Sequence, residues 1–236
     1  MVKSTSENAL KNSQKNKPDR SKKRSGKTAG TKTRTLVRTS PAKKTAGSGL
    51  NAVFLVGFMG AGKSSVGRAL GERLNWIFED LDDRIRRRQG RTVAEIFRLS
   101  GEVEFRRAEH QALREVLEEL RRGGTRIVAL GGGAFVQQKN AALLKAAGAT
   151  TLFLDAPVEE LWRRCCEQAS EAGTERPLLR SQDQFRELHR TRRKNYLEAS
   201  KRIQTGGRPV QAIAAEIVQK LGLKEITVRT EQGDVE

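Results

Sequence analysis

The chain has few cysteines and no long apolar run, the features typical of many secreted and membrane proteins. Its 236 residues include two cysteines, which are adjacent at Cys165 and Cys166. Neighbouring cysteines cannot form a disulfide framework, and they lack the spacing of zinc ligands. No apolar run approaches the ~20 residues that cross a bilayer, and the first residues lack the apolar core of a secretory signal. We therefore expect a cytoplasmic protein that does not contact a membrane, with targeting to an organelle as the alternative.

Acidic residues are scarce at the N-terminal end. The chain carries 46 Lys and Arg against 28 Asp and Glu, a net charge of +18. Residues 1–48 contain 14 basic and 2 acidic side chains, a net charge of +12, which leaves +6 for residues 49–236. A segment with so few large apolar side chains cannot bury enough surface to offset the entropy lost on ordering. We interpret residues 1–48 as a basic disordered tail; binding to nucleic acid or an anionic membrane, and a transit peptide, are alternatives.

Short apolar runs alternate with helical patterns from Asn51 onward. Apolar runs predict strands at Val53–Val56, Trp76–Phe78, Ile127–Leu130 and Thr151–Leu154, with a weaker one at Arg202–Thr205. Helical patterns cover residues 82–122, with breaks near Gly90 and Gly101, and residues 140–147, 158–170, 182–202 and 210–221. This alternation predicts a three-layer α/β/α fold around a parallel sheet of about five strands. We expect the folded domain at residues 49–223 and a frayed C-terminal end at residues 224–236.

Glycines and acidic residues follow the predicted strands directly. Gly57 follows the first strand, Asp80 and Asp82 the second, Gly131–Gly133 the third and Asp155 the fourth. Ligands of parallel α/β sheets bind outside the carboxyl ends of the strands. The sequence therefore predicts a binding site at this edge of the sheet.

The segment Gly57–Ser64 reads GFMGAGKS, which fits the phosphate-binding pattern G-x-x-x-x-G-K-[ST]. Its backbone N–H groups and the following helix N-terminus are suited to bind phosphates. In this pattern Lys63 bridges the β- and γ-phosphates, and Ser64 places a hydroxyl on Mg²⁺. The predicted ATP-phosphate residues are Gly57, Gly60, Ala61, Gly62, Lys63 and Ser64, followed by Ser65.

Arginines beyond this loop favour a small-molecule kinase over other nucleotide-binding proteins. A kinase that acts on an anionic metabolite must hold a second negative ligand and shield the transferring phosphoryl group. With these features, the chain resembles the shikimate kinases, which have the nucleoside-monophosphate-kinase-like P-loop fold, from about Asn51 to Leu221. Five features occur in the family's order: Gly57–Ser64, Asp80-x-Asp82, Gly101–Arg107, Leu130–Ala134 and Arg176–Leu179.

The resemblance implies ATP-dependent phosphorylation of the 3-hydroxyl of shikimate, with Mg²⁺ as cofactor. It assigns Asp80, together with Ser64, to Mg²⁺, and it assigns Asp82 to orienting or deprotonating the attacking hydroxyl. Arg106 matches the family position that binds the substrate carboxylate, and Gly132 would present a backbone N–H to the substrate. The neighbouring Gly131 and Gly133 complete the substrate-binding turn. We expect the enzyme to act as a monomer.

Further arginines carry roles that the resemblance implies. Arg176 matches the lid residue that reaches the γ-phosphate as charge moves. Arg192 matches the second arginine that binds the carboxylate, although Arg190 and Arg193 lie close enough in sequence to compete for this role.

At the adenine end, Arg164 matches the position that flanks the base, with Arg163 as a competitor. Arg208 would cover the other face of the base. Ser65 replaces the threonine that usually follows the P-loop serine and keeps its hydroxyl.

Two other functions stay open from the sequence. One is another metabolite kinase, such as a gluconate kinase, which would share the P-loop without needing two carboxylate-binding arginines. The other is a regulatory or nucleic-acid-binding protein whose working part is the basic tail.

Deletion of residues 1–48 should leave the kinase rate within about twofold of the full-length rate, because tails of this composition rarely support a folded core. Steady-state rates of the two proteins under the same conditions provide the measurement. A much larger loss would mean that the tail contributes to the folded domain.

Overall fold

The computed structural model describes residues 50–172 and 181–225. The predicted tail at 1–48 and Arg176 lie outside these residues. Among the described helices, none is long and apolar enough to cross a membrane.

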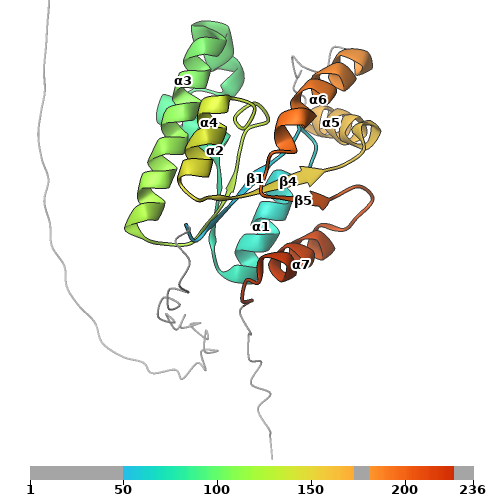
Figure 1. Ribbon diagram of the computed structural model, residues 1–236. Helices are drawn as coiled ribbons and strands as arrows, with labels where there is room; N and C mark the ends of the chain where they lie inside the picture. Colours follow the sequence, from blue (N-terminus) through green and yellow to red (C-terminus); the bar gives the residue numbers. More distant parts are fainter. Residues whose placement is uncertain (1–49, 173–180, 226–236) are drawn as a thin grey trace, which may run out of the picture. The chain divides into compact units, whose positions relative to one another are not determined.

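A parallel sheet forms the centre of the described fold (Figure 1). Its strands are β1 (Ala52–Val56), β2 (Ile77–Asp80), β3 (Arg126–Ala129), β4 (Thr150–Asp155) and β5 (Lys201–Gln204). They lie in the order β2-β3-β1-β4-β5, and each neighbouring pair is parallel. β1 is buried along its whole length because helices cover both faces of the sheet. The predicted fold class is confirmed.

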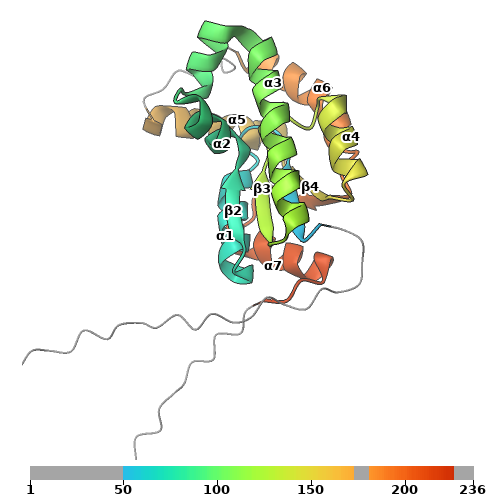
Figure 2. The ribbon, with the colours of Figure 1, turned by 90° about the vertical axis from the view of Figure 1, so that its left-hand side faces the viewer.

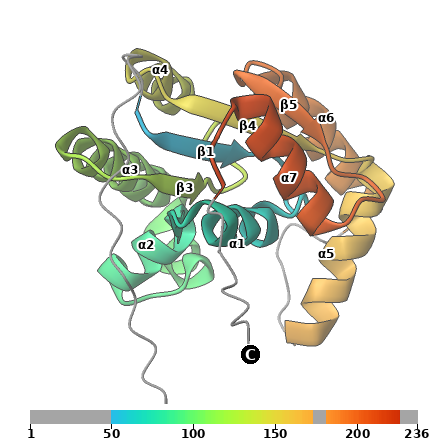
Figure 3. The ribbon, with the colours of Figure 1, turned by 90° about the horizontal axis from the view of Figure 1, so that it is seen from below.

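Helices on the two faces of the sheet complete three layers (Figure 3). α1 (Lys63–Leu74) and α7 (Val210–Leu221) pack against each other on one face, and α3 (Val93–Arg122) and α4 (Gln138–Ala146) lie on the other. Figure 2 shows α2 (Leu81–Gln89) beside α3. The remaining helices are α5 (Val158–Ala172) and α6 (Gln182–Tyr196).

The predicted helix breaks occur where glycine adopts positive φ. Gly90 ends α2 with a φ of 62°, and Gly101 interrupts α3 with a φ of 78°. One predicted boundary is wrong: the helix expected to reach residue 202 ends at Tyr196. The backbone N–H of Ser200 donates to Thr151 Oγ1 at 2.9 Å, so the chain turns back to the sheet and forms β5 beside β4.

A network of four ion-paired side chains lies at the start of the second strand–helix connection. Glu79, 9% exposed, accepts hydrogen bonds from Arg84 Nε at 2.7 Å and Arg126 Nη1 at 2.8 Å. Glu119 of α3 binds the same two arginines, and the hydrogen bond from Arg84 lowers its pKa to about 2. The network links β2, β3, α2 and α3, and it fixes the backbone immediately before Asp80.

Glu79→Ala should lower the free energy of unfolding by about 3 kcal/mol, because it removes a buried carboxylate that both Arg84 and Arg126 bind. Glu118→Ala is the matched control, since Glu118 is 49% exposed and lies 3.9 Å from Arg114. The control should change stability by less than about 0.5 kcal/mol. Urea denaturation measures both, and equal small effects would contradict a stabilising role for the network.

Candidate active site

The P-loop between β1 and α1 depends on backbone that approaches its neighbours closely. Gly57 has a φ of 146°, and a Cβ there would lie 2.7 Å from the carbonyl oxygen of Leu154. Gly60 has a φ of 77°, and a Cβ there would lie 2.7 Å from the carbonyl oxygen of Leu161. Larger residues therefore cannot replace these glycines without displacing β4 or α5. Gly62, also at positive φ, caps α1, so the helix begins at Lys63.

Lys63 directs its side chain back over this loop. Its Nζ donates to the carbonyl oxygens of Gly57 and Phe58 at 3.0 and 2.9 Å. Burial lowers the pKa of the Lys63 ammonium, and the nearby carboxylates of Asp80 and Asp82 oppose that change. A half-buried cation with acidic neighbours therefore lies at the start of α1.

Ser64 and Asp80 lie together at the end of β2. The hydroxyl of Ser64 donates to Asp80 Oδ2 at 2.9 Å, and the other carboxylate oxygen accepts from the N–H of Asp82 at 3.0 Å. Asp80 is thereby the N-cap of α2. A hydroxyl and a carboxylate are hard oxygen donors, and Mg²⁺ in kinases is commonly held by one or two such groups together with phosphate oxygens. This pair fits Mg²⁺.

Asp82 lies in the first turn of α2 and faces the glycine turn Gly131–Gly133. A Cβ on Gly131 would lie 2.7 Å from Asp82 Oδ1, and this buried oxygen has no hydrogen-bond partner among the described residues. Burial, assisted by the charge of Asp80, raises the pKa of the Asp82 carboxyl to about 6. Asp82 can therefore accept a hydrogen bond or a proton from a ligand above the turn.

Arg106 of α3 reaches the other side of the same turn. A Cβ on Gly133 would lie 2.5 Å from the terminal nitrogens of Arg106, so the guanidinium occupies the space beside this glycine. Arg106 pairs with Glu109 at 2.9 Å and Glu102 at 3.1 Å. Glu109 also accepts from Gln137, which follows the turn.

The three competing arginines of α6 have different surroundings. Arg192 Nη1 lies 3.7 Å from the Cβ position of Gly132, and its guanidinium is 5.9 Å from the Phe58 ring centroid. Arg193 pairs with Asp155 at 2.8 Å, whereas the 75% exposed Arg190 pairs with Glu187 at 2.9 Å. The structure therefore brings Arg192, and neither of the other two, to the glycine turn.

Arg164, predicted to flank adenine, lies against the P-loop at Gly60. Arg164 donates to the carbonyl oxygens of Gly60 at 3.2 Å and Thr205 at 3.3 Å, so it bridges the P-loop and the end of β5. Its competitor Arg163 is 61% exposed and pairs with Glu167.

The other two predicted ATP-binding residues in the described part of the chain are Arg208 and Ser65. Arg208 donates to the carbonyl oxygen of Gln204 at 2.8 Å and pairs with Glu216. Ser65 is exposed on α1.

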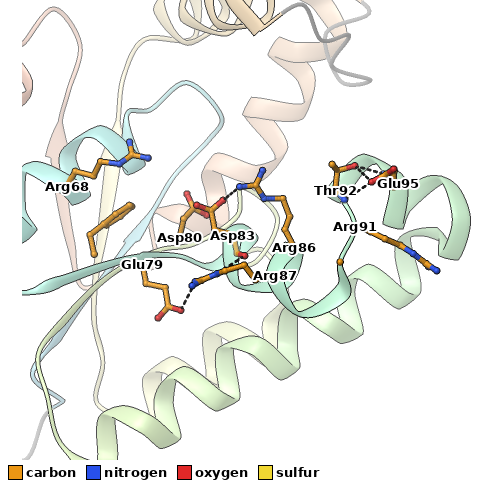
Figure 4. A pocket seen from close by; sticks show the side chains of 11 residues that line it. Arg68, Glu79, Asp80, Asp83, Arg86, Arg87, Arg91, Thr92 and Glu95 are labelled. Carbon is orange, nitrogen blue, oxygen red and sulfur yellow. Dashed lines mark hydrogen bonds and ion pairs between the residues drawn. The ribbon is translucent and has the colours of Figure 1, made fainter. Parts of the chain in front are cut away.

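A separate pocket of about 700 Å³ opens on the outer side of Asp80 (Figure 4). Arg68 of α1 lies at one end and Arg91, after α2, at the other, while Arg86 pairs with Asp83 between them. Apart from Asp80, the residues that line this pocket are not among the predicted site residues.

Comparisons with known proteins decide the family. The family model for shikimate kinase matches residues 59–222. The chain is 41% identical to the shikimate kinase of Geobacter metallireducens, over 73% of this chain and 93% of that protein. It is 35% identical to the shikimate kinase of Persephonella marina, over 72% of this chain and 98% of that protein. The chain belongs to the shikimate kinase family.

Solved structures of the family agree with the fold. The shikimate kinase of Acinetobacter baumannii in complex with shikimate superimposes with a TM-score of 0.65 at 34% identity, covering 74% of this chain and 94% of that chain. Membership in the family makes the chain an enzyme that phosphorylates shikimate with ATP as co-substrate. The function predicted from the sequence is confirmed at this level.

The structure adds two residues that sequence reasoning did not assign to the shikimate kinase site. Glu109 is fully buried beside Arg106, and burial raises the pKa of its carboxyl to about 7. Tyr196 is also fully buried, and its hydroxyl donates to the carbonyl oxygen of Gly132. Helical spacing was the available signal for both, since Glu109 is three residues after Arg106 and Tyr196 is four residues after Arg192.

Asp82→Asn should stabilise the protein at neutral pH when nucleotide and divalent cations are absent. The stability contributed by Asp82 is fully present below about pH 4 and is lost as pH rises through its raised pKa of about 6. The variant should therefore exceed the wild type by up to about 3 kcal/mol at pH 8 and match it at pH 4. Denaturant titrations in chelator at both pH values provide the measurement.

The matched control is Asp83→Asn, because Asp83 is 47% exposed in the same helical turn. Its effect should stay within about 0.5 kcal/mol at both pH values. An Asp82→Asn protein that is less stable than the wild type at pH 8 would show that the carboxylate is stabilised where it lies.

Proposed function

We propose that this chain transfers the γ-phosphoryl group of ATP to the 3-hydroxyl of shikimate in a single in-line step. The observation that carries the proposal is the convergence of Asp82, Arg106 and Arg192 on the turn Gly131–Gly133, next to the P-loop. A carboxylate on one side and two guanidinium groups on the other match a substrate with a hydroxyl at one end and a carboxylate at the other.

The phosphate side of the site is formed by the P-loop. The N–H groups of Gly60, Ala61 and Gly62 and the N-terminus of α1 would bind the β- and γ-phosphates. Lys63 is half-buried beside these groups and would stabilise the charge that develops on the transferring phosphoryl group. Ser64 and Asp80 would hold Mg²⁺, which supplies charge neutralisation at the phosphate oxygens when it is bound.

The acceptor side orients the attacking hydroxyl. Asp82 Oδ1, buried and unpartnered among the described residues, would accept the hydrogen bond of the 3-hydroxyl and take its proton. Arg106 and Arg192 would each offer a planar fork to the carboxylate, and Gly132 would add a backbone N–H. With both ends held, the hydroxyl is aligned with the phosphoryl group, which accounts for much of the rate in phosphoryl transfer.

Further roles of this chain remain proposals. Arg176, outside the described residues, would reach the γ-phosphate, and Arg164 and Arg208 would flank adenine. The domain boundaries at 49 and 223, the monomeric state and the cytoplasmic location stay predictions. Nucleic-acid binding by residues 1–48 also stays a prediction, which the net charge of +12 on this segment motivates.

Arg106→Ala should raise the KM for shikimate roughly a hundredfold and leave ATP binding within about twofold, since it removes one of two carboxylate ligands. Arg107→Ala is the matched control, because Arg107 is 74% exposed on the same helix. ADP release from Mg-ATP is measured with shikimate, with gluconate and with no acceptor.

Turnover that requires shikimate and falls only in Arg106→Ala supports the proposed site. Equal loss of ATP binding and shikimate use in that variant would mean that the substrate site lies elsewhere. Bound ATP without any shikimate-dependent ADP release would overturn the proposed function itself.

A further inference from the structure

Two consecutive arginines of α6 point to different parts of the protein. Arg192 faces the glycine turn, with Nη1 3.7 Å from the Cβ position of Gly132. Arg193 points instead to the end of β4, where its Nη2 lies 2.8 Å from Asp155 Oδ2. Consecutive helical residues are rotated by roughly 100° about the helix axis, so the direction of one side chain sets the direction of the other.

Asp155 is held at the end of β4 by several contacts and lies outside the proposed substrate site. Its side chain is 5% exposed and pairs with Arg193 and, at 2.6 Å, with Arg202 of β5. Its backbone carbonyl oxygen accepts from the N–H of Thr205 at 2.7 Å, so this last residue of β4 is tied to the end of β5. A guanidinium that binds this carboxylate is therefore tied to the rigid part of the fold.

Other contacts also hold α6 against the domain, and most of them are apolar. Phe185 and Tyr196 are fully buried, and the ring of His189 packs edge-on against Phe58 with ring centroids 5.3 Å apart. Apolar burial is not directional, and a ring contact tolerates small rotations. Tyr196, at the end of α6, also donates its hydroxyl to the carbonyl oxygen of Gly132. Charge-assisted hydrogen bonds to a buried carboxylate are stronger than such a neutral bond, so the pair Asp155–Arg193 adds a strong directional restraint on the rotation of α6.

We propose that Asp155 and Arg193 are positioning residues, which fix α6 so that Arg192 reaches the shikimate carboxylate. This inference rests on the proposed role of Arg192. It assigns a function to Asp155, the acidic residue at the end of β4, which lies outside the proposed substrate site. It also explains why a carboxylate shared by two arginines is buried at the edge of the site.

A purely electrostatic role for Arg193 makes a different prediction. Arg193→Ala removes a positive charge near an anionic substrate, so both roles predict a higher KM for shikimate. Asp155→Asn adds a net positive charge, so the electrostatic role predicts a lower KM. Positioning predicts a higher KM in both variants, because Arg193→Ala removes this directional pair and Asp155→Asn weakens it by removing the charge of the acceptor.

Steady-state kinetics of the full-length chain with Mg-ATP and shikimate test the proposal. Arg193→Ala and Asp155→Asn should each raise the KM for shikimate roughly five- to tenfold, with kcat and the KM for ATP within about twofold. Arg190→Ala, which removes a 75% exposed charge from the same helix, should keep the wild-type KM. Thermal melts confirm that each variant is folded.

A lower KM in Asp155→Asn, or an equal rise in Arg190→Ala, would overturn positioning in favour of electrostatics. Unchanged KM with reduced thermal stability would reduce the pair to a structural role and also overturn the proposal. Arg193→Ala should fold in any case, because Asp155 keeps Arg202. If Asp155→Asn does not fold, the KM of Arg193→Ala for shikimate is measured at about 0.5 M salt, where charge effects are screened. A KM rise that persists at this salt supports positioning, and one that disappears supports the electrostatic role.

Arg192→Ala separates this inference from the proposed function. A large KM rise in Arg192→Ala without one in Arg193→Ala leaves the substrate site intact and overturns only the positioning role. No KM change in Arg192→Ala would remove the proposed carboxylate ligand, and the positioning inference with it.

Discussion

The close approach of the backbone at two glycine turns is the constraint on which the rest of the site depends. At the P-loop, Gly57 brings the chain against the carbonyl oxygen of Leu154, where a Cβ would lie only 2.7 Å away. At the second turn, Gly131 and Gly133 leave the space that Asp82 and Arg106 occupy. Because glycine has no side chain, the P-loop, the Asp82 carboxylate and the Arg106 guanidinium can lie close together at these turns.

This arrangement gathers charged groups in a partly buried site, and ion pairs that lie next to the site stabilise the fold. Burial opposes the charged forms of Lys63 and Asp82, so the site itself is not the most stable arrangement for these groups. Two ion-pair groups next to the site have complete pairing: Glu79 with Arg84 and Arg126, and Asp155 with its two arginines. The first precedes Asp80 in the chain and the second lies beside α6.

Much of the arrangement of the candidate site was predictable, because it follows from short local sequence patterns. The P-loop occupies eight consecutive residues, and Asp80 and Asp82 follow a strand directly, so their proximity required only a parallel sheet. The helix breaks at Gly90 and Gly101 were also predictable, since glycine readily adopts the positive φ that each break has. The end of α6 was not, because a long-range bond between Ser200 and Thr151 determines it.

The sequence by itself determined the order of the strands and helices along the chain, the phosphate-binding loop and the set of candidate arginines. The tertiary structure alone decided which arginine faces which partner. Arg190, Arg192 and Arg193 lie within four consecutive residues, and the sequence alone does not tell them apart. The rotation of α6 against β4 places Arg190 in solvent beside Glu187, Arg192 at the glycine turn and Arg193 against Asp155. It also decided that Glu109 and Tyr196 adjoin the turn Gly131–Gly133. The physical reason is that periodicity fixes which residues share a helix face, whereas the direction of that face depends on contacts between segments distant in sequence.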